Sequence, residues 1–381
     1  MKITQLFKDF SNSEKSGGIV LIACTIISMV LANTNLVGNY THFWHSILGG
    51  QSIEYWINDG LMTLFFLLIG LELEREIYIG ELSKIKNALL PIFGAFGGMM
   101  IPAVIYLLFN FGTSTKSGAG IPMATDIAFA LGILALLGSK VPTSLKVFLT
   151  ALAVIDDLGA ILVIAIFYTK SIIWMNLFIA MSILVSLFAL NRLKIRNLIP
   201  YLIGGIAMWY FMLNSGVHAT ITGVLVAFAI PFGNGDKKST SYILQHYLHK
   251  PVAFIILPLF ALANTAIMVN TDLGDIISQK FSLGISLGLI IGKPIGIVLF
   301  SFLAVTFGIC KLPNDLNWKS IIGVGFLGGI GFTMSIFITL LAFDDFELQN
   351  SSKITILIAS IIAAIIGFIS HHFSLKKLPK S

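Results

Sequence analysis

The sequence contains few charged residues. Asp, Glu, Lys and Arg make up 11% of its 381 residues, whereas hydrophobic residues make up 56% and the mean hydropathy is +0.93. Soluble globular domains carry about a quarter charged residues, so the composition excludes that class and indicates a polytopic membrane protein. Cysteine is scarce too: Cys24 and Cys310 lie in separate apolar segments without a CxxC spacing, which argues against a disulfide framework or a zinc site.

Long polar stretches are also missing. The longest polar loop, residues 233–250, is too short for a soluble domain. Hydrophobic segments continue from the first apolar run to the C-terminus, whereas cleavage of a signal peptide would release a soluble chain. We therefore expect one integral membrane transporter domain over residues 1–381, with a cytoplasmic leader (1–16), membrane spans (17–373) and a cytoplasmic tail (374–381). The net charge of +6 is attributed to basic cytoplasmic loops. The expected partner is the lipid bilayer, with no nucleic acid and no cofactor.

Apolar runs of about 20 residues separated by polar, glycine or proline breaks predict an all-α fold with about twelve transmembrane helices. The predicted spans are 17–34, 58–78, 87–109, 121–138, 145–168, 172–191, 198–213, 215–232, 251–269, 282–307, 320–343 and 354–373. An even number places both termini on one side. Nineteen of the 24 Lys and Arg residues then share that side, four (Lys116, Lys170, Lys280 and Lys353) lie opposite, and one lies within a span. The positive-inside rule makes the side of the termini cytoplasmic.

Two adjacent acids, Asp156 and Asp157, interrupt the fifth span near its middle, in the segment LAVIDDLGAI. A charged side chain at the membrane centre costs roughly 2.5 to 3.5 kcal/mol, and intramembrane acids generally mark ion or proton paths. Neighbouring side chains on a helix diverge by about 100°, so one acid is expected to face a cavity and the other a different helix. Carboxylate oxygens suit sodium or lithium, and protonation removes the ligand charge. The alternative is that both acids only hold the helix bundle together.

Two segments rich in glycine or proline predict interrupted helices. Thr125 and Asp126 follow Pro122 in ATDIAFALG of the fourth span, and the eleventh span contains GGIGFTMSIF. Two interrupted helices at corresponding positions of spans 3 to 5 and 10 to 12 are typical of inverted-repeat transporters. An acid at a broken helix can neutralise the positive helix N-terminus. The alternatives are a local hydroxyl-to-backbone bond beside a pocket acid in the fourth span and close helix packing in the eleventh.

Lys293 lies in GKPIG, deep within the tenth span, too far from either end to reach the membrane surface. It needs a carboxylate or exposed carbonyl dipoles, and the sequence offers Asp156 or Asp157. A pair that opens on ion binding would let the lysine release a proton; a permanent stabilising bridge is the alternative.

Other titratable residues lie near the predicted membrane surface. The segment LELERE at the end of the second span is either an interfacial anchor or an acidic funnel that concentrates cations. Histidines in SGVHATITG and in an HxxH spacing before Pro251 are candidates for pH sensing; metal binding by HxxH lacks a third ligand, and ordinary polar packing is the alternative. The candidates for pH regulation are Glu72, Arg75, Glu76, His218, His246 and His249.

Together these segments resemble the NhaA family of sodium/proton antiporters over nearly the whole chain. ATDIAFALG, VIDDLGAI, SGVHAT, GKPIG and GIGFTMSIF match in order and spacing. The resemblance implies twelve spans, with helices four and eleven crossing at their interruptions, in a bacterial inner membrane. It also implies electrogenic, pH-regulated exchange, in which more protons enter than sodium ions leave, by alternating access.

The resemblance further implies a role for each site residue. Asp157, with Asp156, would bind Na⁺ or Li⁺ in competition with protons, and Thr125 would support that site. Asp126 would balance helix-end dipoles, while Lys293 would pair with Asp156 and balance the opposite helix ends.

The sequence departs from the family pattern in three places. Family members commonly carry lysine at the position of Glu74 and glutamate at that of Gln245, both in regions tied to pH regulation. The loop 41–55, where Gly49 and Gly50 favour either a hairpin turn or a plain loop, is shorter than the hairpin through which the family forms homodimers.

Two other functions fit parts of the sequence. An intramembrane aspartyl protease would use Asp126 with Asp157 on facing helices, but it has no place for adjacent acids or a mid-span lysine. A passive cation channel would conduct sodium without moving protons.

Overall fold

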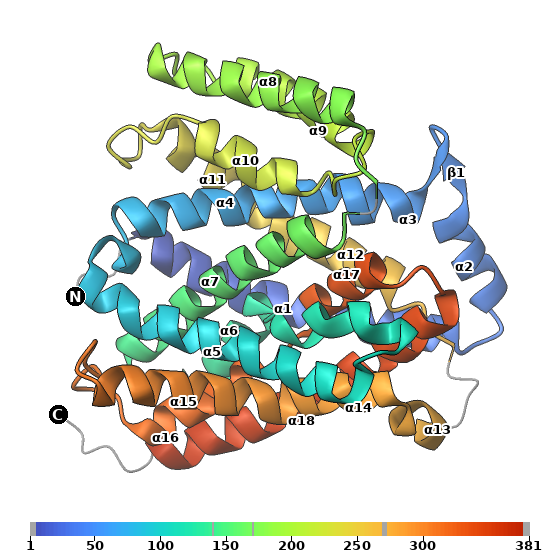
Figure 1. Ribbon diagram of the computed structural model, residues 1–381, viewed down its shortest axis with the longest axis vertical. Coiled ribbons are helices and arrows are strands. Elements are labelled where there is room, and N and C mark those ends of the chain that lie inside the picture. Colours follow the sequence, from blue (N-terminus) through green and yellow to red (C-terminus); the bar gives the residue numbers. More distant parts are fainter. Residues whose placement is uncertain (1–4, 139–140, 170, 269–272, 376–381) are drawn as a thin grey trace.

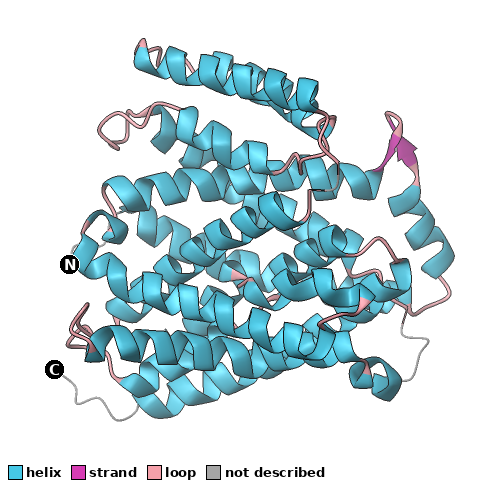
Figure 2. Cartoon of the chain, in the orientation of Figure 1, coloured by secondary structure: helices cyan, strands magenta, loops and turns pink. Residues whose placement is uncertain are grey.

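The computed structural model describes residues 5–138, 141–169, 171–268 and 273–375. Its helices lie side by side along one direction (Figure 1), and loops gather at the two ends of the bundle (Figure 2). The first helix begins and the last helix ends at the same end of the molecule, and the hairpin of β1 (Ile47–Leu48) and β2 (Gln51–Ser52) lies at the other. We call these the terminal side and the hairpin side.

The α-helices are α1 (Gln5–Ala32), α2 (Val37–His45), α3 (Ile53–Tyr55), α4 (Met62–Tyr78), α5 (Ile85–Asn110), α6 (Ile127–Leu136), α7 (Thr143–Phe167), α8 (Trp174–Arg192), α9 (Ile199–Leu213), α10 (Ile221–Ala229), α11 (Thr240–Pro251), α12 (Leu257–Asn264), α13 (Leu273–Ser278), α14 (Lys280–Leu287), α15 (Lys293–Thr306), α16 (Trp318–Gly328), α17 (Phe332–Ala342) and α18 (Phe346–Leu375). The 3₁₀ segments are Glu81–Ser83 and Ser114–Met123, and the π segments are Trp56–Leu61, Val252–Ile256 and Gly288–Gly292.

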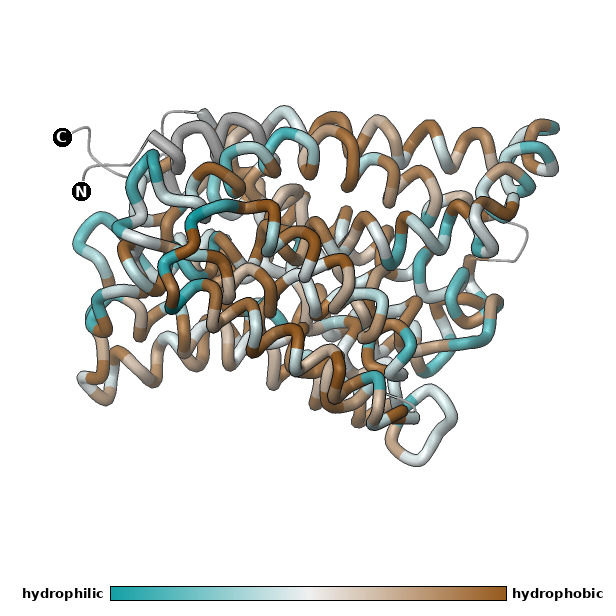
Figure 3. Tube along the Cα trace, turned by 90° about the horizontal axis from the view of Figure 1, so that it is seen from above, coloured by the Kyte–Doolittle hydropathy of each residue, from teal (hydrophilic) through white to brown (hydrophobic). Residues whose placement is uncertain are grey.

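Within the described residues, seven helices are long and apolar enough to cross a membrane, or up to ten if each bent pair counts as one span. In Figure 3 hydrophobic residues follow most of the helix lengths, while hydrophilic residues gather toward the ends. The prediction of a helical polytopic membrane protein is therefore confirmed, whereas twelve spans and an inverted repeat stay predictions.

The structure differs from the sequence-based boundaries in several places, and helix α11 (Thr240–Pro251) occupies most of the expected polar loop 233–250. Helix α1 begins at Gln5, inside the expected leader. The loop 41–55 contains helical turns of α2 and a two-stranded hairpin around Gly49 and Gly50, so the hairpin interpretation is correct. Helix α18 begins at Phe346 rather than 354, and it buries Lys353, which was expected in an outer loop.

Small residues allow close packing around the centre of the bundle. A Cβ at Gly97 of α5 would meet the carbonyl of Gly296 in α15, and a Cβ at Gly296 would meet the carbonyl of Gly97. Likewise a Cβ at Gly325 of α16 would lie 2.8 Å from the Cα of Pro294. These contacts hold α15, whose first residue is Lys293, tightly against α5 and α16.

Candidate functional site

Two interrupted helices meet in the core, and the interruptions lie in the glycine and proline segments that predict them. The 3₁₀ segment Ser114–Met123 and α6 are bent by 41° across residues 124–126, and α16 and α17 are bent by 45° across residues 329–331. The backbone N–H of Asp126 donates to the carbonyl of Ile330 at 2.7 Å. The two breaks are therefore joined by backbone groups that helical hydrogen bonding leaves unpaired.

Asp126 caps two helices at once. Its Oδ1 accepts from the N–H of Phe129 at 2.9 Å, which caps α6, and its Oδ2 accepts from the N–H of Thr333 at 3.1 Å in the first turn of α17. The Thr333 hydroxyl donates to the same Oδ2. A carboxylate at helix N-termini is favoured by the unpaired N–H groups and by the helix dipole, so this geometry compensates the buried charge of Asp126.

Asp156 contacts two other predicted site residues, Thr125 and Lys293. Its Oδ2 accepts a hydrogen bond from the hydroxyl of Thr125 at 2.7 Å and forms an ion pair with Nζ of Lys293. The same hydroxyl lies 2.8 Å from the carbonyl oxygen of Gly328, at the end of α16. All three side chains are fully buried. Of the two partners that the sequence offered Lys293, the structure therefore places Asp156 against it.

Asp157 lies differently from its neighbour. Its side chain is fully buried, and neither carboxylate oxygen has a hydrogen-bond partner among the described residues. The second oxygen of Asp156, Oδ1, is in the same situation. Buried carboxylates require hydrogen bonds, a proton or a cation, so the chemistry of these three oxygens suits a proton or a hard cation.

The acids of LELERE do not all lie at the surface. Glu72 and Glu74 of α4 are buried, so an interfacial anchor does not describe them, whereas Arg75 is partly exposed and lies 5.2 Å from the ring centroid of Tyr242. Nε2 of His249 lies 3.3 Å from Oε1 of Glu72. Glu76, one turn beyond Glu72, is partly exposed.

A small cavity of about 10 Å³ joins this region to the site. Glu72, Asp126 and Thr333 are among its lining residues. This is about the smallest cavity that can hold one water molecule. The half of α4 that lies toward the terminal side and contains Glu72 is therefore next to the helix break at Asp126.

The histidine candidates lie in different environments. His249 is buried beside Glu72, while His246, three residues earlier on α11, is exposed and stacks on Tyr242 with 6.3 Å between ring centroids. His218 lies in the loop before α10, where Nε2 is 3.1 Å from the carbonyl oxygen of Tyr168. Among the described residues no group of three or more His, Cys, Asp or Glu side chains could hold a metal ion.

The sequence interpretation missed a polar cavity on the hairpin side. This cavity, of about 460 Å³, is lined by Glu54 and Asp59 together with His218 and Phe337 of α17. Glu54 also lies 3.5 Å from Nε2 of His45. In the sequence, this cavity is indicated only by Glu54 and Asp59 close to the start of the second predicted span. Acids are common at the ends of membrane spans, so these two did not stand out.

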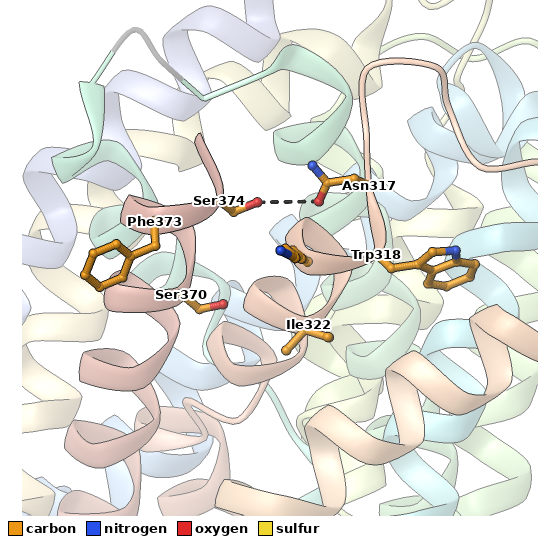
Figure 4. Close-up of a pocket in the computed structure, with 7 residues that line it drawn as sticks. Asn317, Trp318, Ile322, Ser370, Phe373 and Ser374 are labelled. Atoms are coloured by element: carbon orange, nitrogen blue, oxygen red, sulfur yellow. Dashed lines mark hydrogen bonds between the residues drawn. The ribbon is translucent and has the colours of Figure 1, made fainter. Parts of the chain in front are cut away.

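A separate cavity of about 750 Å³ lies on the terminal side, between the start of α16 and the end of α18. It is lined by Asn317, Trp318, Lys319, Ile322, Ser370, Phe373 and Ser374, and the hydroxyl of Ser374 lies 3.4 Å from Oδ1 of Asn317 (Figure 4). None of the predicted site residues lines it.

A membrane-spanning bundle with two adjoining helix breaks, buried acids and a buried lysine defines a secondary ion transporter. The chain belongs to the Na⁺/H⁺ antiporter 1 family, whose pattern matches residues 8–370. It is 71% identical over 376 residues to the Na⁺/H⁺ antiporter NhaA of Flavobacterium psychrophilum, covering 99% of this chain and 98% of that one. It is 61% identical over 377 residues to the Na⁺/H⁺ antiporter NhaA of Cytophaga hutchinsonii, covering 99% and 97%.

Family membership confirms the resemblance seen in the sequence. It makes the protein a membrane antiporter of a bacterial family and a transporter rather than an enzyme, which removes the aspartyl protease alternative.

Proposed function

We propose that the protein exchanges Na⁺ or Li⁺ for protons at Asp156 and Asp157, with more protons entering than cations leaving, so that transport is electrogenic. The observation that carries this proposal is the buried Asp157 carboxylate, both of whose oxygens lack a hydrogen-bond partner in the described chain, beside the Asp156–Lys293 pair. A carboxylate in that position must hold either a proton or a hard cation.

Competition follows from the chemistry of the two acids. A proton on Asp157 removes the negative charge that a sodium ion needs, and a bound sodium ion disfavours protonation. When the cation also binds Asp156, it competes with Lys293 for the Asp156 carboxylate. The Lys293 ammonium then loses its counter-charge. Loss of that counter-charge favours release of a proton from Lys293, which supplies a second exchangeable proton.

Alternating access requires one path to the site from each side of the membrane. The small cavity beside Glu72 and Asp126 supports entry from the terminal side, and the acidic cavity lined by Glu54 and Asp59 supports exit on the hairpin side. Glu72, Arg75, Glu76, His246 and His249 would regulate the first path with pH, and His218 would regulate the second.

The rest of the proposal concerns placement in the membrane. The chain crosses a bacterial inner membrane twelve times as one domain, its interrupted helices cross at their breaks, and both termini are cytoplasmic. The proposed assembly is a homodimer joined through the β1–β2 hairpin, and it needs no cofactor.

Everted membrane vesicles test the exchange. An imposed proton gradient, followed with a pH-sensitive dye, should dissipate when Na⁺ or Li⁺ is added, and Asp157→Asn should abolish that response. Asp275→Asn is the matched control, because Asp275 is exposed. A full response from Asp157→Asn would refute the site assignment.

The channel alternative gives a different result in the same vesicles. A passive channel would admit ²²Na⁺ without changing the proton gradient when the membrane potential is clamped. Exchange should instead move both ions in opposite directions, and the rate should respond to the membrane potential.

A further inference from the structure

The helical span that carries Lys293 contains a π turn, Gly288–Gly292, directly before this residue. The backbone N–H of Lys293 donates to the carbonyl of Gly288, five residues back, and not to that of Leu289, four residues back. The next residue, Pro294, has no N–H to donate. The carbonyl of Leu289 is therefore left without a helical donor, although it is the acceptor that Lys293 would use in an ordinary α-helix.

The carbonyl of Leu289 lies against the second helix break. A Cβ at Gly329 would overlap with this oxygen, so only glycine allows the break to approach so closely. The π turn also touches the first interrupted helix, since a Cβ at Gly288 would lie 2.7 Å from Cβ of Pro122. Movement at either break is therefore transmitted to the turn that precedes Lys293.

The chain beyond the π turn is held in place. Glycine contacts fix α15 against α5 and α16, including the contact of Gly325 with Cα of Pro294. A displacement of the breaks therefore acts on the π turn and on the residue at its end, Lys293. The N–H of Lys293 belongs to the turn, while its side chain forms the ion pair with Asp156.

A second π turn, Val252–Ile256, has the same construction. The N–H of the residue after it again reaches five residues back, Pro258 follows, and the carbonyl of Ala253 is left without a helical donor. A glycine of another helix covers this carbonyl too, since a Cβ at Gly17 of α1 would lie 3.1 Å from it. Only the turn before Lys293, however, leads into a charged side chain of the ion site.

We propose that the π turn before Lys293 is a two-state switch that withdraws this side chain from Asp156 during exchange. Pro294 and Gly329 are its positioning residues: the proline leaves the carbonyl of Leu289 without a donor, and the glycine covers that carbonyl in the observed state. Turns of this kind occur mostly at functional positions. The switch rests on the proposed exchange and adds how the ion pair opens.

The second state follows from the free acceptor. When the second break moves, Gly329 uncovers the carbonyl of Leu289, the N–H of Lys293 transfers to it, and the turn becomes α-helical. Successive residues of a helix lie about 100° apart, so a turn that becomes one residue shorter re-aims the side chain at its end. The ammonium then leaves Asp156, whose carboxylate becomes available to the cation.

Pro294→Ala tests the switch in everted vesicles. It supplies an N–H that can donate to Leu289, five residues back, and so stabilises the observed state. The maximal rate of Na⁺-driven proton movement should fall about fivefold or more, while the apparent KM for Na⁺ stays within about twofold and the melting temperature does not fall. Pro258→Ala is the matched control, because it makes the same chemical change in the second π turn, and it should retain most of the wild-type rate.

A Pro294→Ala variant that exchanges ions as fast as Pro258→Ala would overturn the switch. Absence of exchange in the wild type would instead refute the proposed function, so the two failures are distinguishable.

Hydrogen–deuterium exchange of the wild type gives the answer if Pro294→Ala does not fold. Saturating Na⁺ should raise deuterium uptake in the peptide 288–293 about twofold over choline chloride at the same ionic strength, because the Lys293 amide opens when its hydrogen bond changes acceptor. The peptide 295–306, which covers the rest of α15, is the internal control and should change little. Equal uptake by the peptide 288–293 in the two salts would overturn the switch.

Discussion

Removal of the positive charge of Lys293 should destabilise the protein strongly. Lys293 and Asp156 are both fully buried and paired, and loss of one partner from a buried ion pair costs about 3 to 5 kcal/mol. Lys293→Met keeps most of the aliphatic stem, so it isolates the charge. After the substitution Asp156 keeps only the Thr125 hydroxyl as a donor among the described residues.

The double variant Lys293→Met with Asp156→Asn should recover most of that loss. It removes both charges of the Asp156–Lys293 pair, so neither position keeps a charge without its counter-charge, and the amide oxygen of the introduced asparagine still accepts the hydrogen bond from Thr125. Replacing a whole buried ion pair by neutral groups is often close to neutral in free energy. We expect the melting temperatures in detergent at pH 8 to follow the order wild type, double variant and then, well below both, Lys293→Met.

Sodium gives this experiment a second readout. A cation beside Asp156 and Asp157 supplies the charge that Lys293→Met lacks, so Na⁺ should raise the melting temperature of this variant more than that of the wild type. Protons should act in the same direction as the pH is lowered. Lys319→Met is the control, because Lys319 is exposed and should change stability by no more than about 0.5 kcal/mol.

Two results would refute the reasoning. If the double variant melts as early as Lys293→Met, the loss arises from packing of the lysine stem and not from an unpaired charge. If Na⁺ raises the melting temperatures of both proteins equally, the cation does not bind next to the carboxylate that Lys293 compensates.

Three further predictions follow from the site. Asp126→Ala removes the caps of α6 and α17 and should cost roughly 1 to 4 kcal/mol in unfolding experiments, because each cap contributes about 0.5 to 2 kcal/mol; Asp126→Asn, which keeps an acceptor, should cost less, and equal losses would contradict the capping role. The apparent KM for Na⁺ in everted vesicles should rise as the pH falls, by up to about tenfold per pH unit for one competing proton, whereas a pH-independent KM would exclude competition. His249→Ala should move the activity–pH curve further than His246→Ala does, because His249 is buried against Glu72 whereas His246 is exposed; a larger shift from His246→Ala would contradict a leading role for His249.

Local sequence chemistry predicts the helix breaks well. Pro122 and the glycines of GGIGF weaken helical winding, and the breaks lie at residues 124–126 and 329–331 as expected. The contact between these breaks could not be predicted from local chemistry, since Asp126 and Ile330 are far apart in sequence and periodicity is a local property; only the family resemblance implied that the two helices cross there. The same limit applies to Asp156 and Asp157: helix geometry says that their side chains diverge, but not which one faces Lys293.

Hydropathy predicts burial in lipid but not burial in protein. The segment before residue 354 is polar, so Lys353 appeared to lie in an outer loop, yet α18 extends through it and the protein buries its side chain. Glu72 and Glu74 were similarly ambiguous, because acids near a span end suit either a surface anchor or a buried path. Only the packing of the other helices around them distinguishes the two.

The contacts of the three buried aspartates assign them different roles in the proposed exchange. Asp126 is compensated by two helix N-termini, so its charge is bound to the architecture and is not available to the ion. Asp156 and Lys293 compensate each other, which leaves the charge of Asp157 as the net negative charge of the cluster when all three of its groups are ionised. One monovalent cation or one proton neutralises it. A cation that also binds Asp156 must weaken the ion pair between Asp156 and Lys293. The Lys293 ammonium, which stabilises the fold through this pair, therefore opposes tight binding of the cation. This opposition favours release of the cation, which an exchanger needs as much as binding.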